Sequence, residues 1–135
     1  MDYKKIMDGL SEQFSDYPAM YERVVHDIID KLGTPYYLQT KLKEKRDFGL
    51  NKYGEYSFQG SLKNTLTSPT MEHIEEELVD AMNYLAHEHL KSTLLYPQYT
   101  AEIDRRFQEI LETMGGIGEL KAKVSACFSV EDARD

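Results

Sequence analysis

Two pairs of acidic residues carry the strongest chemical signal in this sequence. Glu44 and Asp47 form one pair, and Glu77 and Asp80 form the other, each with a spacing of three residues. Residues at that spacing share one face of a helix, so both carboxylates of a pair can converge on one point. Mg²⁺ prefers carboxylate oxygens and keeps waters that substrate phosphates can replace. If the two helices pack antiparallel, four carboxylates can meet across one interface, as in bundle metal sites. The pairs therefore predict a site for Mg²⁺, or for Mn²⁺ in its place.

Each pair also has a plainer interpretation. The run Glu75–Glu77 can be a solvated charge cluster near a helix N-terminus, where acidic side chains interact favourably with the helix dipole. The segment Lys43–Asp47 can be an ordinary mixed-charge surface with ion pairs inside the helix. Both interpretations stay open at the level of the sequence.

The elements that would position these carboxylates are helices. Apolar residues recur at intervals of three and four, and no segment alternates as a strand would. We therefore expect an all-α fold, a helical bundle of five helices completed by oligomerisation. The predicted helices span about residues 18–32, 35–48, 69–94, 98–114 and 118–128.

Proline and glycine set the predicted helix boundaries, because proline favours the first turn and glycine accepts the conformation that follows a helix. The predicted starts are Thr34-Pro35 and Ser68-Pro69, and the predicted ends are Gly33, Gly49 and Gly115-Gly116. Between them, residues 49–68 are predicted to form a loop of about twenty residues, an unusual length that is often functional.

The predicted helix at 69–94 places its acidic residues relative to a buried stripe. That stripe is predicted to consist of Ile74, Leu78, Ala81 and Leu85. Glu77 and Asp80 then lie on one flank of the stripe, while Glu75 points the other way. Like charges beside a buried stripe repel each other, and a divalent cation would relieve that repulsion.

Two segments together resemble a known family. They are Lys45-Arg-Asp-Phe-Gly-Leu-Asn-Lys-Tyr-Gly54 and Glu76-Glu-Leu-Val-Asp-Ala-Met-Asn-Tyr-Leu85. The combination resembles phage-type MazG-like proteins of the all-α nucleoside triphosphate pyrophosphohydrolase superfamily, relatives of the dimeric dUTPases. The resemblance covers residues 38–91. The family pairs a Glu-x-x-Glu helix with a later Glu-x-x-Asp helix, and here the earlier motif is Glu44-x-x-Asp47.

The resemblance implies hydrolysis of an NTP or dNTP to the monophosphate and pyrophosphate, in nucleotide-pool or alarmone control. It also implies a homodimer or homotetramer. Glu44, Asp47, Glu77 and Asp80 would bind the metal, and Glu76 would assist from the outer shell or orient the attacking water. The candidate substrate-binding residues are Lys45, Arg46 and Lys52 for phosphates, Tyr53 or Tyr84 for stacking on the base, and Asn83 for a sugar or base edge.

Composition narrows the function further. The 135 residues fit a single domain over 1–135, with residues 1–17 and 129–135 peripheral. The net charge of −8 argues against nucleic-acid binding. No apolar stretch could span a membrane, and one cysteine, Cys127, fits a cytoplasmic location, in the host if the chain is phage-encoded. Two alternatives remain, namely a catalytically silent helical protein that binds a nucleotide or a host protein, and a structural oligomeric bundle.

Overall fold

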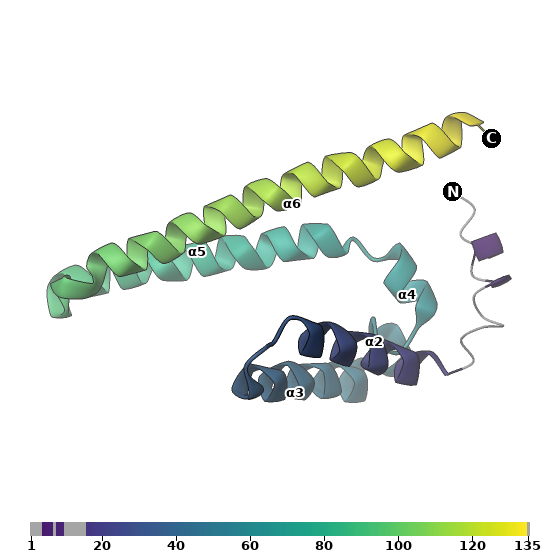
Figure 1. Cartoon of the computed structure of the whole chain (residues 1–135), viewed down its shortest axis with the longest axis horizontal. Helices are drawn as coiled ribbons and strands as arrows, with labels where there is room; N and C mark the ends of the chain where they lie inside the picture. The colour runs from purple at the N-terminus through teal and green to yellow at the C-terminus, as the bar shows by residue number, and fades with distance from the viewer. Residues whose placement is uncertain (1–3, 7, 10–15, 135) are drawn as a thin grey trace. The chain divides into compact units, whose positions relative to one another are not determined.

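The computed structural model describes residues 4–6, 8–9 and 16–134, with side chains as far as Phe128. Every regular element within these ranges is a helix, which confirms the all-α fold (Figure 1). The chain divides into two compact units, an N-terminal unit of residues 2–68 and a C-terminal unit that begins at Pro69. None of the described helices is long and apolar enough to cross a membrane. Much of the predicted peripheral segments, 1–17 and 129–135, lies outside the described residues.

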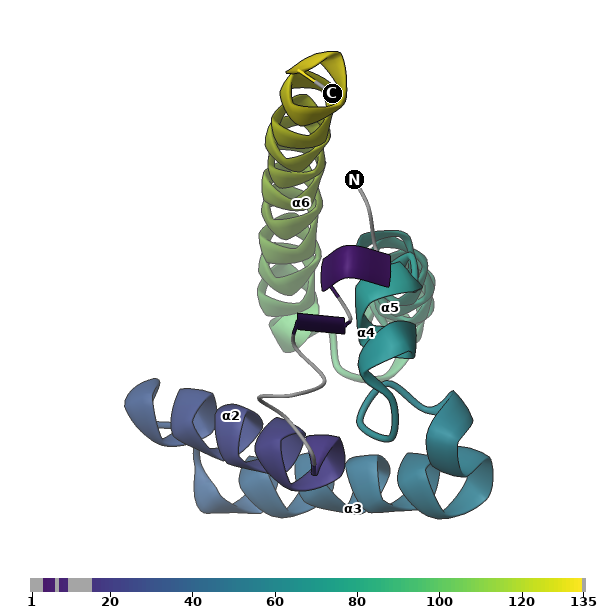
Figure 2. The same cartoon turned by 90° about the vertical axis from the view of Figure 1, so that its right-hand side faces the viewer.

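The N-terminal unit contains α2 (Tyr17–Lys31), α3 (Tyr36–Tyr53), η1 (Gly54–Tyr56) and α4 (Leu62–Thr67). Helices α2 and α3 lie side by side in both views (Figures 1 and 2). Asp16 caps α2 by accepting a hydrogen bond from the Ala19 amide at 3.3 Å. Gly33 follows that helix with a φ of 66°, as predicted for a helix end. The α2 prediction is therefore confirmed at both ends to within one residue.

Helix α3 continues past the glycine that was predicted to end it. Gly49 lies inside the helix, and Gly54 ends it instead, with a φ of 54°. A glycine inside a helix costs only about 0.5–1 kcal/mol relative to alanine, so neighbouring residues can carry the helix through it. Residues 49–68 contain the end of α3, all of η1 and all of α4. The predicted twenty-residue loop is therefore wrong.

The C-terminal unit is a helical hairpin. Helix α5 (Thr70–Leu95) is followed by η2 (Pro97–Tyr99) and then by α6 (Thr100–Arg134), which packs antiparallel against α5 (Figures 1 and 2). The separate helices predicted at 98–114 and 118–128 are one helix, so Gly115-Gly116 does not end it. The apolar spacing continues through the glycines, with Met114 and Ile117 both half-buried.

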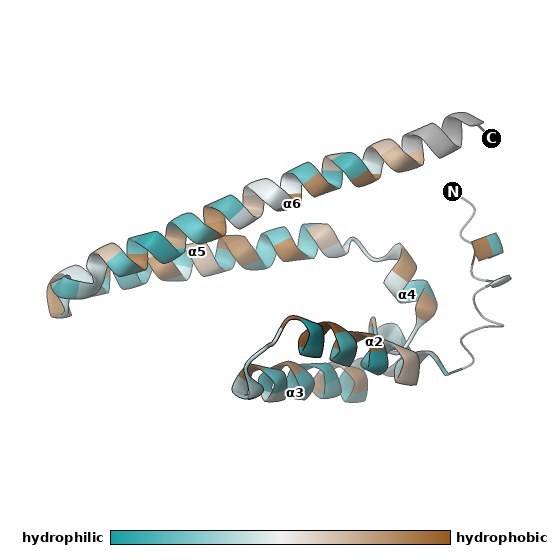
Figure 3. Cartoon of the chain, viewed as in Figure 1, coloured by the Kyte–Doolittle hydropathy of each residue, from teal (hydrophilic) through white to brown (hydrophobic). Residues whose placement is uncertain are grey.

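The face shared by α5 and α6, here called the hairpin interface, follows a heptad pattern. Its buried or half-buried residues recur at intervals of three and four, with one interval of seven between Leu85 and Ser92, which is the spacing of coiled-coil interfaces. Figure 3 shows the resulting mixture of apolar and polar colour along both helices. The interface residues are Met71, Glu75, Leu78, Met82, Leu85 and Ser92 of α5, and Thr100, Ile103, Phe107, Ile110, Met114, Ile117 and Lys121 of α6.

Two predicted helix starts shift by one residue. Pro35 and Pro69 precede α3 and α5 as the cap residues, and neither cap makes a side-chain hydrogen bond. Thr34 and Ser68 therefore lie one position outside the predicted cap. The carbonyl oxygens of the two prolines accept the first helical hydrogen bonds, from Gln39 and His73 respectively.

Candidate functional site

One face of α5 carries all the site residues predicted on that helix. Glu76, Glu77, Asp80, Asn83 and Tyr84 are exposed, together with His73. At about 100° per residue these positions fall within an arc of about 120°, opposite the hairpin interface. The fold therefore gathers the predicted residues of this helix on one solvent-facing surface, which we call the acidic face.

The predicted buried stripe of α5 is partly wrong. Leu78, Ala81 and Leu85 are half-buried, but Ile74 is 42 % exposed. Met71, Glu75 and Met82 occupy the hairpin interface instead, because α6 packs on a face rotated from the predicted one. Glu77 and Asp80 consequently lie opposite the interface rather than on its flank.

Glu75 corrects the interpretation of the run Glu75–Glu77 as a solvated cluster. Its carboxylate lies 2.6 Å from the ammonium of Lys121, which also lies 3.4 Å from Glu72 (both measured from Nζ to Oε1). The contact with Glu75, reinforced by the one with Glu72, raises the pKa of Lys121. Glu75 therefore has a structural role at the open end of the hairpin, which its place in the sequence does not reveal.

Other acidic residues of α5 are also engaged. The hydroxyl of Tyr96 donates a hydrogen bond to Glu88 at 2.5 Å, which lowers the pKa of that carboxyl group. Glu76 lies 3.8 Å from the imidazole of His73. Within the described residues, Glu77 and Asp80 have neither an ion pair nor a side-chain hydrogen bond. They are the two carboxylates of this helix that remain free to bind a cation.

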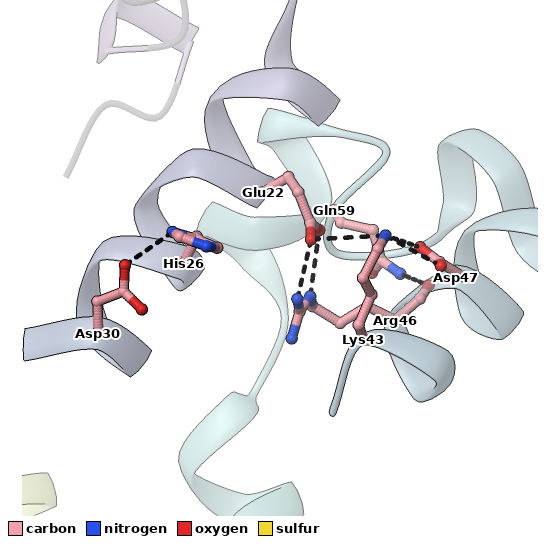
Figure 4. Close-up of polar contacts among 7 residues, drawn as sticks. All are labelled: Glu22, His26, Asp30, Lys43, Arg46, Asp47 and Gln59. Carbon is pink, nitrogen blue, oxygen red and sulfur yellow. Dashed lines mark hydrogen bonds and ion pairs between the residues drawn. The ribbon is translucent and has the colours of Figure 1, made fainter. Parts of the chain in front are cut away.

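The first acidic pair lies on α3 in the N-terminal unit. Asp47 pairs with Lys43 at 3.1 Å within the helix, as the plainer interpretation of this segment predicts (Figure 4). Glu44 is exposed and has no ion pair in the described part of the chain. Glu44 is therefore the carboxylate of this pair that can bind a ligand without breaking an existing contact.

Arg46 forms a two-pronged ion pair that joins α3 to α2. Its guanidinium donates hydrogen bonds to both carboxylate oxygens of Glu22, at 2.9 and 3.2 Å (Figure 4). These hydrogen bonds lower the pKa of Glu22 and raise that of Arg46. The Arg46 side chain is 15 % exposed, so it is the most buried cation among the predicted phosphate ligands. Planar bidentate pairs of this kind fix side-chain orientation as well as adding stability.

A cavity of about 500 Å³ lies in the N-terminal unit, within the size range of small-molecule sites. It brings together Lys45, Arg46 and Tyr53, three of the residues predicted to bind substrate. Lys52 instead lies over the rings of Phe48 and Tyr53, at 5.6 and 5.3 Å from their centroids. The full lining is Tyr21, Lys45, Arg46, Gly49, Tyr53, Tyr56, Ser57, Phe58 and Gln59.

The turn from Gly54 to Gly60 holds one wall of this cavity. The Ser57 hydroxyl donates to the Gly54 carbonyl at 2.6 Å and accepts from the Gly60 amide at 3.1 Å. A Cβ atom at Gly60 would lie 2.0 Å from the same carbonyl oxygen, so only glycine fits there. The Gln59 side-chain amide donates to the main-chain carbonyl of Arg46, which ties the turn to α3 (Figure 4).

Sequence reasoning missed three contributors to this unit, namely Tyr21, Glu22 and Gln59. Tyr21 and Glu22 come from α2, and no motif or spacing links them to α3. Burial raises the pKa of Tyr21, with a further contribution from neighbouring Tyr17. Gln59 lies in the predicted loop, where an uncharged residue gives no chemical signal. The density of glycine and aromatic residues in that segment was the available clue.

The two acidic pairs belong to different units, Glu44 and Asp47 to the N-terminal unit and Glu77 and Asp80 to the C-terminal unit. Within the described ranges, no three Asp, Glu, His or Cys side chains form a cluster that could hold a metal ion. Comparisons with protein-family models, curated proteins and solved structures found no match.

Proposed function

We propose that this protein is a Mg²⁺-dependent nucleoside triphosphate pyrophosphohydrolase. The observation that carries the proposal is which acidic residues of α5 have a partner and which do not. Glu72 and Glu75 pair with Lys121, and Glu88 binds Tyr96, whereas Glu77 and Asp80 remain unpaired at a spacing of three residues. The resemblance of residues 38–91 to MazG-like pyrophosphohydrolases gives this free pair its proposed chemistry.

The free pair suits Mg²⁺ because this ion is usually held by one or two carboxylates, with waters and substrate phosphates filling its other positions. Glu77 and Asp80 are the proposed metal ligands on α5, and Glu44 and Asp47 are the proposed metal ligands on α3. A bound Mg²⁺ supplies charge neutralisation for the phosphates and lowers the pKa of a bound water. Glu76, on the same face of α5, would orient water beside the ion.

Each unit carries residues that we propose bind the substrate. Lys45 has no ion pair among the described residues and lines the cavity, so its ammonium is available to a phosphate. Tyr53 offers a ring to the base in the same cavity. Asn83 and Tyr84 lie on the acidic face of α5 and remain the proposed contacts to sugar or base edges.

The test is pyrophosphate release from a panel of NTPs, dNTPs and ppGpp in the presence of Mg²⁺ or Mn²⁺. We expect release from at least one of these substrates, and a loss of about 100-fold or more in Glu77→Gln and Asp80→Asn because the variants weaken charge neutralisation at the phosphates. Glu119→Gln is the matched control, since Glu119 is exposed on α6, outside the acidic face. Circular dichroism checks that each variant is folded.

Two results would contradict the proposal. One is the absence of pyrophosphate release from every substrate by the folded wild-type chain. The other is full activity in the Glu77→Gln/Asp80→Asn double variant. The same preparation also tests metal binding alone, because a ligand of the native state raises the melting temperature by mass action. We expect Mg²⁺ to raise the melting temperature of the wild type and of Glu119→Gln, but not of the double variant.

We also propose that the chain acts as a homodimer or homotetramer. In the described part of the C-terminal unit, the large apolar residues are at most half-buried, and several beside the hairpin interface are over 40 % exposed, including Ile74, Val79 and Leu120. A second copy covering these residues would remove apolar surface from water. Light scattering coupled to size-exclusion chromatography measures the mass directly, and a monomer at micromolar concentration would refute this part.

A second candidate function is nucleotide binding without turnover. The observation that favours it is that Arg46 and Asp47 are already engaged, with Glu22 and Lys43 respectively. In that case a nucleotide binds to the folded chain with no product formed over hours, and substitution of the acidic residues weakens that binding. Calorimetry and the pyrophosphate assay on the same sample separate the two candidates.

A further inference from the structure

The cavity of the N-terminal unit has walls suited to a flat aromatic ligand. Tyr53 comes from the end of α3, Tyr56 from η1 and Phe58 from the turn that follows, and their side chains line one cavity with Tyr21. Aromatic rings stack on any nucleobase, and such stacking contributes about 1–3 kcal/mol per base. A cavity of about 500 Å³ has room for a base and its sugar.

The wall is fixed before a ligand arrives. The Gly54 to Gly60 turn is closed by both hydrogen bonds of the Ser57 hydroxyl, and Ser57 is 8 % exposed. The backbone at Gly60 packs so closely on the Gly54 carbonyl that an added Cβ atom would clash with it. Because the Gly54 to Gly60 turn is already ordered, binding of a ligand loses less conformational entropy than binding to a flexible loop would.

Gln59 supplies a directional polar group to this cavity. Its side chain is about nine-tenths buried, and its amide nitrogen donates to the Arg46 carbonyl. That hydrogen bond fixes which end of the amide is nitrogen, because two carbonyl oxygens would repel each other. No other hydrogen bond of the Gln59 side chain occurs within the described residues, so the amide oxygen Oε1 is left as an acceptor. An accessible acceptor without a protein partner can accept a hydrogen bond from an N–H donor of a ligand.

Gly49 makes this arrangement possible from the α3 side. A Cβ atom at position 49 would lie 3.3 Å from the Gln59 amide nitrogen, which is tighter than ordinary contact. Glycine inside the helix thus lets the amide approach the Arg46 carbonyl. The cation at the cavity that remains unpaired is Lys45, since Arg46 is bound to Glu22.

We propose that this cavity binds the base of a nucleotide and that Gln59 selects bases with an amino group over those with a carbonyl group at the same position. Adenine and cytosine would donate an amino hydrogen to the Gln59 oxygen, while hypoxanthine and uracil would present a carbonyl oxygen to it. Lys45 would attract the phosphates. The inference rests on the proposed function only in taking the ligand to be a nucleotide.

The test measures binding of AMP against IMP, and of CMP against UMP, by calorimetry in EDTA. Each pair differs in an amino or a carbonyl group, and without metal no hydrolysis enters the measurement. We expect the amino member of each pair to bind about 5- to 10-fold more tightly, as expected for one net hydrogen bond. Gln59→Leu should abolish this preference.

Further variants guard against a folding artefact. Tyr53→Leu should weaken all four ligands alike and keep the preference, because stacking does not distinguish the members of a pair. Tyr37→Leu is the matched control, since Tyr37 is 63 % exposed on α3 and lies outside the cavity. If Gln59→Leu proves unfolded by circular dichroism, the base preference of the wild type and the result for Tyr53→Leu still test the inference.

The inference fails if the wild type binds both members of each pair equally, or binds none of the four at millimolar concentration. It also fails if folded Gln59→Leu keeps the preference. These failures differ from failure of the proposed function. Pyrophosphate release without base preference would remove the inference alone, whereas base-selective binding in EDTA without any hydrolysis in Mg²⁺ would remove the hydrolase alone.

Discussion

The two units of this protein use their polar residues in opposite ways. In the N-terminal unit, polar contacts join separate elements and surround a cavity, as with Arg46 and Glu22 or Gln59 and the Arg46 carbonyl. In the C-terminal unit, polar pairs mark the two ends of an apolar interface, Glu75 with Lys121 at one end and Ser92 with Thr100 at the other. The N-terminal unit therefore contains a cavity lined by polar contacts, while the C-terminal unit is a helical hairpin with an exposed acidic face.

The difference shows how each unit specifies its structure. In the hairpin, polar residues at heptad positions favour the register that pairs them over slipped alternatives. In the N-terminal unit, the backbone geometry and buried hydrogen bonds of the tight Gly54 to Gly60 turn specify the local structure. Substitutions should consequently affect the two units by different mechanisms, which the following variants separate.

The largest effect is expected for Gly60→Ala. Its Cβ would lie 2.0 Å from the Gly54 carbonyl oxygen and 2.8 Å from the Ser57 hydroxyl, so the turn must open. We expect a loss of about 3 kcal/mol in the free energy of unfolding of the N-terminal unit, at the upper end for overpacking. Urea unfolding measures the loss, and hydrogen exchange locates it. Amides of the α5–α6 hairpin should keep their protection, and equal loss in both units would break the comparison.

A smaller loss is expected for Lys121→Met, this time in the hairpin. The substitution keeps the length of the side chain but leaves the half-buried Glu75 without its cation. We expect a lower melting temperature and reduced protection of amides near Glu72 and Glu75. The double variant Glu75→Leu/Lys121→Met should recover stability, because it replaces the ion pair with apolar contact. If Lys121→Met alone is as stable as the wild type, Lys121 does not stabilise this end of the hairpin.

A change of opposite sign is expected for Gly118→Ala. Gly118 lies inside α6, and an added Cβ would have no atom within 4 Å beyond its chain neighbours and the backbone of its own helix, in contrast to Gly60. Alanine in an exposed helix is more favourable than glycine by about 1 kcal/mol or less. The melting temperature should therefore rise slightly. A fall in stability at this position would mean that the α6 surface around it is covered in solution.

The smallest effect is the pH dependence that comes from Glu22. Its pKa is lowered from the ordinary value of 4.5, first by the hydrogen bonds from Arg46. A lowered folded pKa gives stabilisation that is complete above pH 4.5 and is lost as the pH falls toward and through the folded value. The side chain is 39 % exposed, so solvent screening keeps the effect small. Comparing unfolding of the wild type and Glu22→Gln from pH 6 to pH 3 should show a steeper decline for the wild type.

Local signals predicted the helices well and their endings less well. The α2 and α5 predictions hold to within one residue because proline and continuous apolar spacing agree there. Gly49 and Gly115-Gly116 misled because a glycine in a helix costs little when flanking residues pack. At Gly49 the reason for glycine is the approach of Gln59, which only the folded chain shows.

For the candidate site, too, local spacing predicted some features, while contacts between helices could not be predicted. Glu77, Asp80 and their neighbours on α5 share one exposed face, as helical spacing implies. Helical spacing placed Glu75 on a different face from Glu77, but it could not predict the ion pair of Glu75 with Lys121, which lies on another helix. The Glu22–Arg46 pair likewise depends on how α2 packs against α3. Contacts between distant residues carry no local pattern, so charge spacing alone cannot assign them.

The short turn at Pro97–Tyr99 has a consequence for how the chain folds. It brings the Ser92 and Thr100 hydroxyl oxygens to a distance of 2.7 Å. The first tertiary contact of the hairpin therefore closes a very small loop. Later contacts can then form one helical turn at a time, each at low entropic cost, until Lys121 reaches Glu75. We expect the α5–α6 hairpin to fold rapidly, beginning at the Pro97–Tyr99 turn, as proteins with local contacts do.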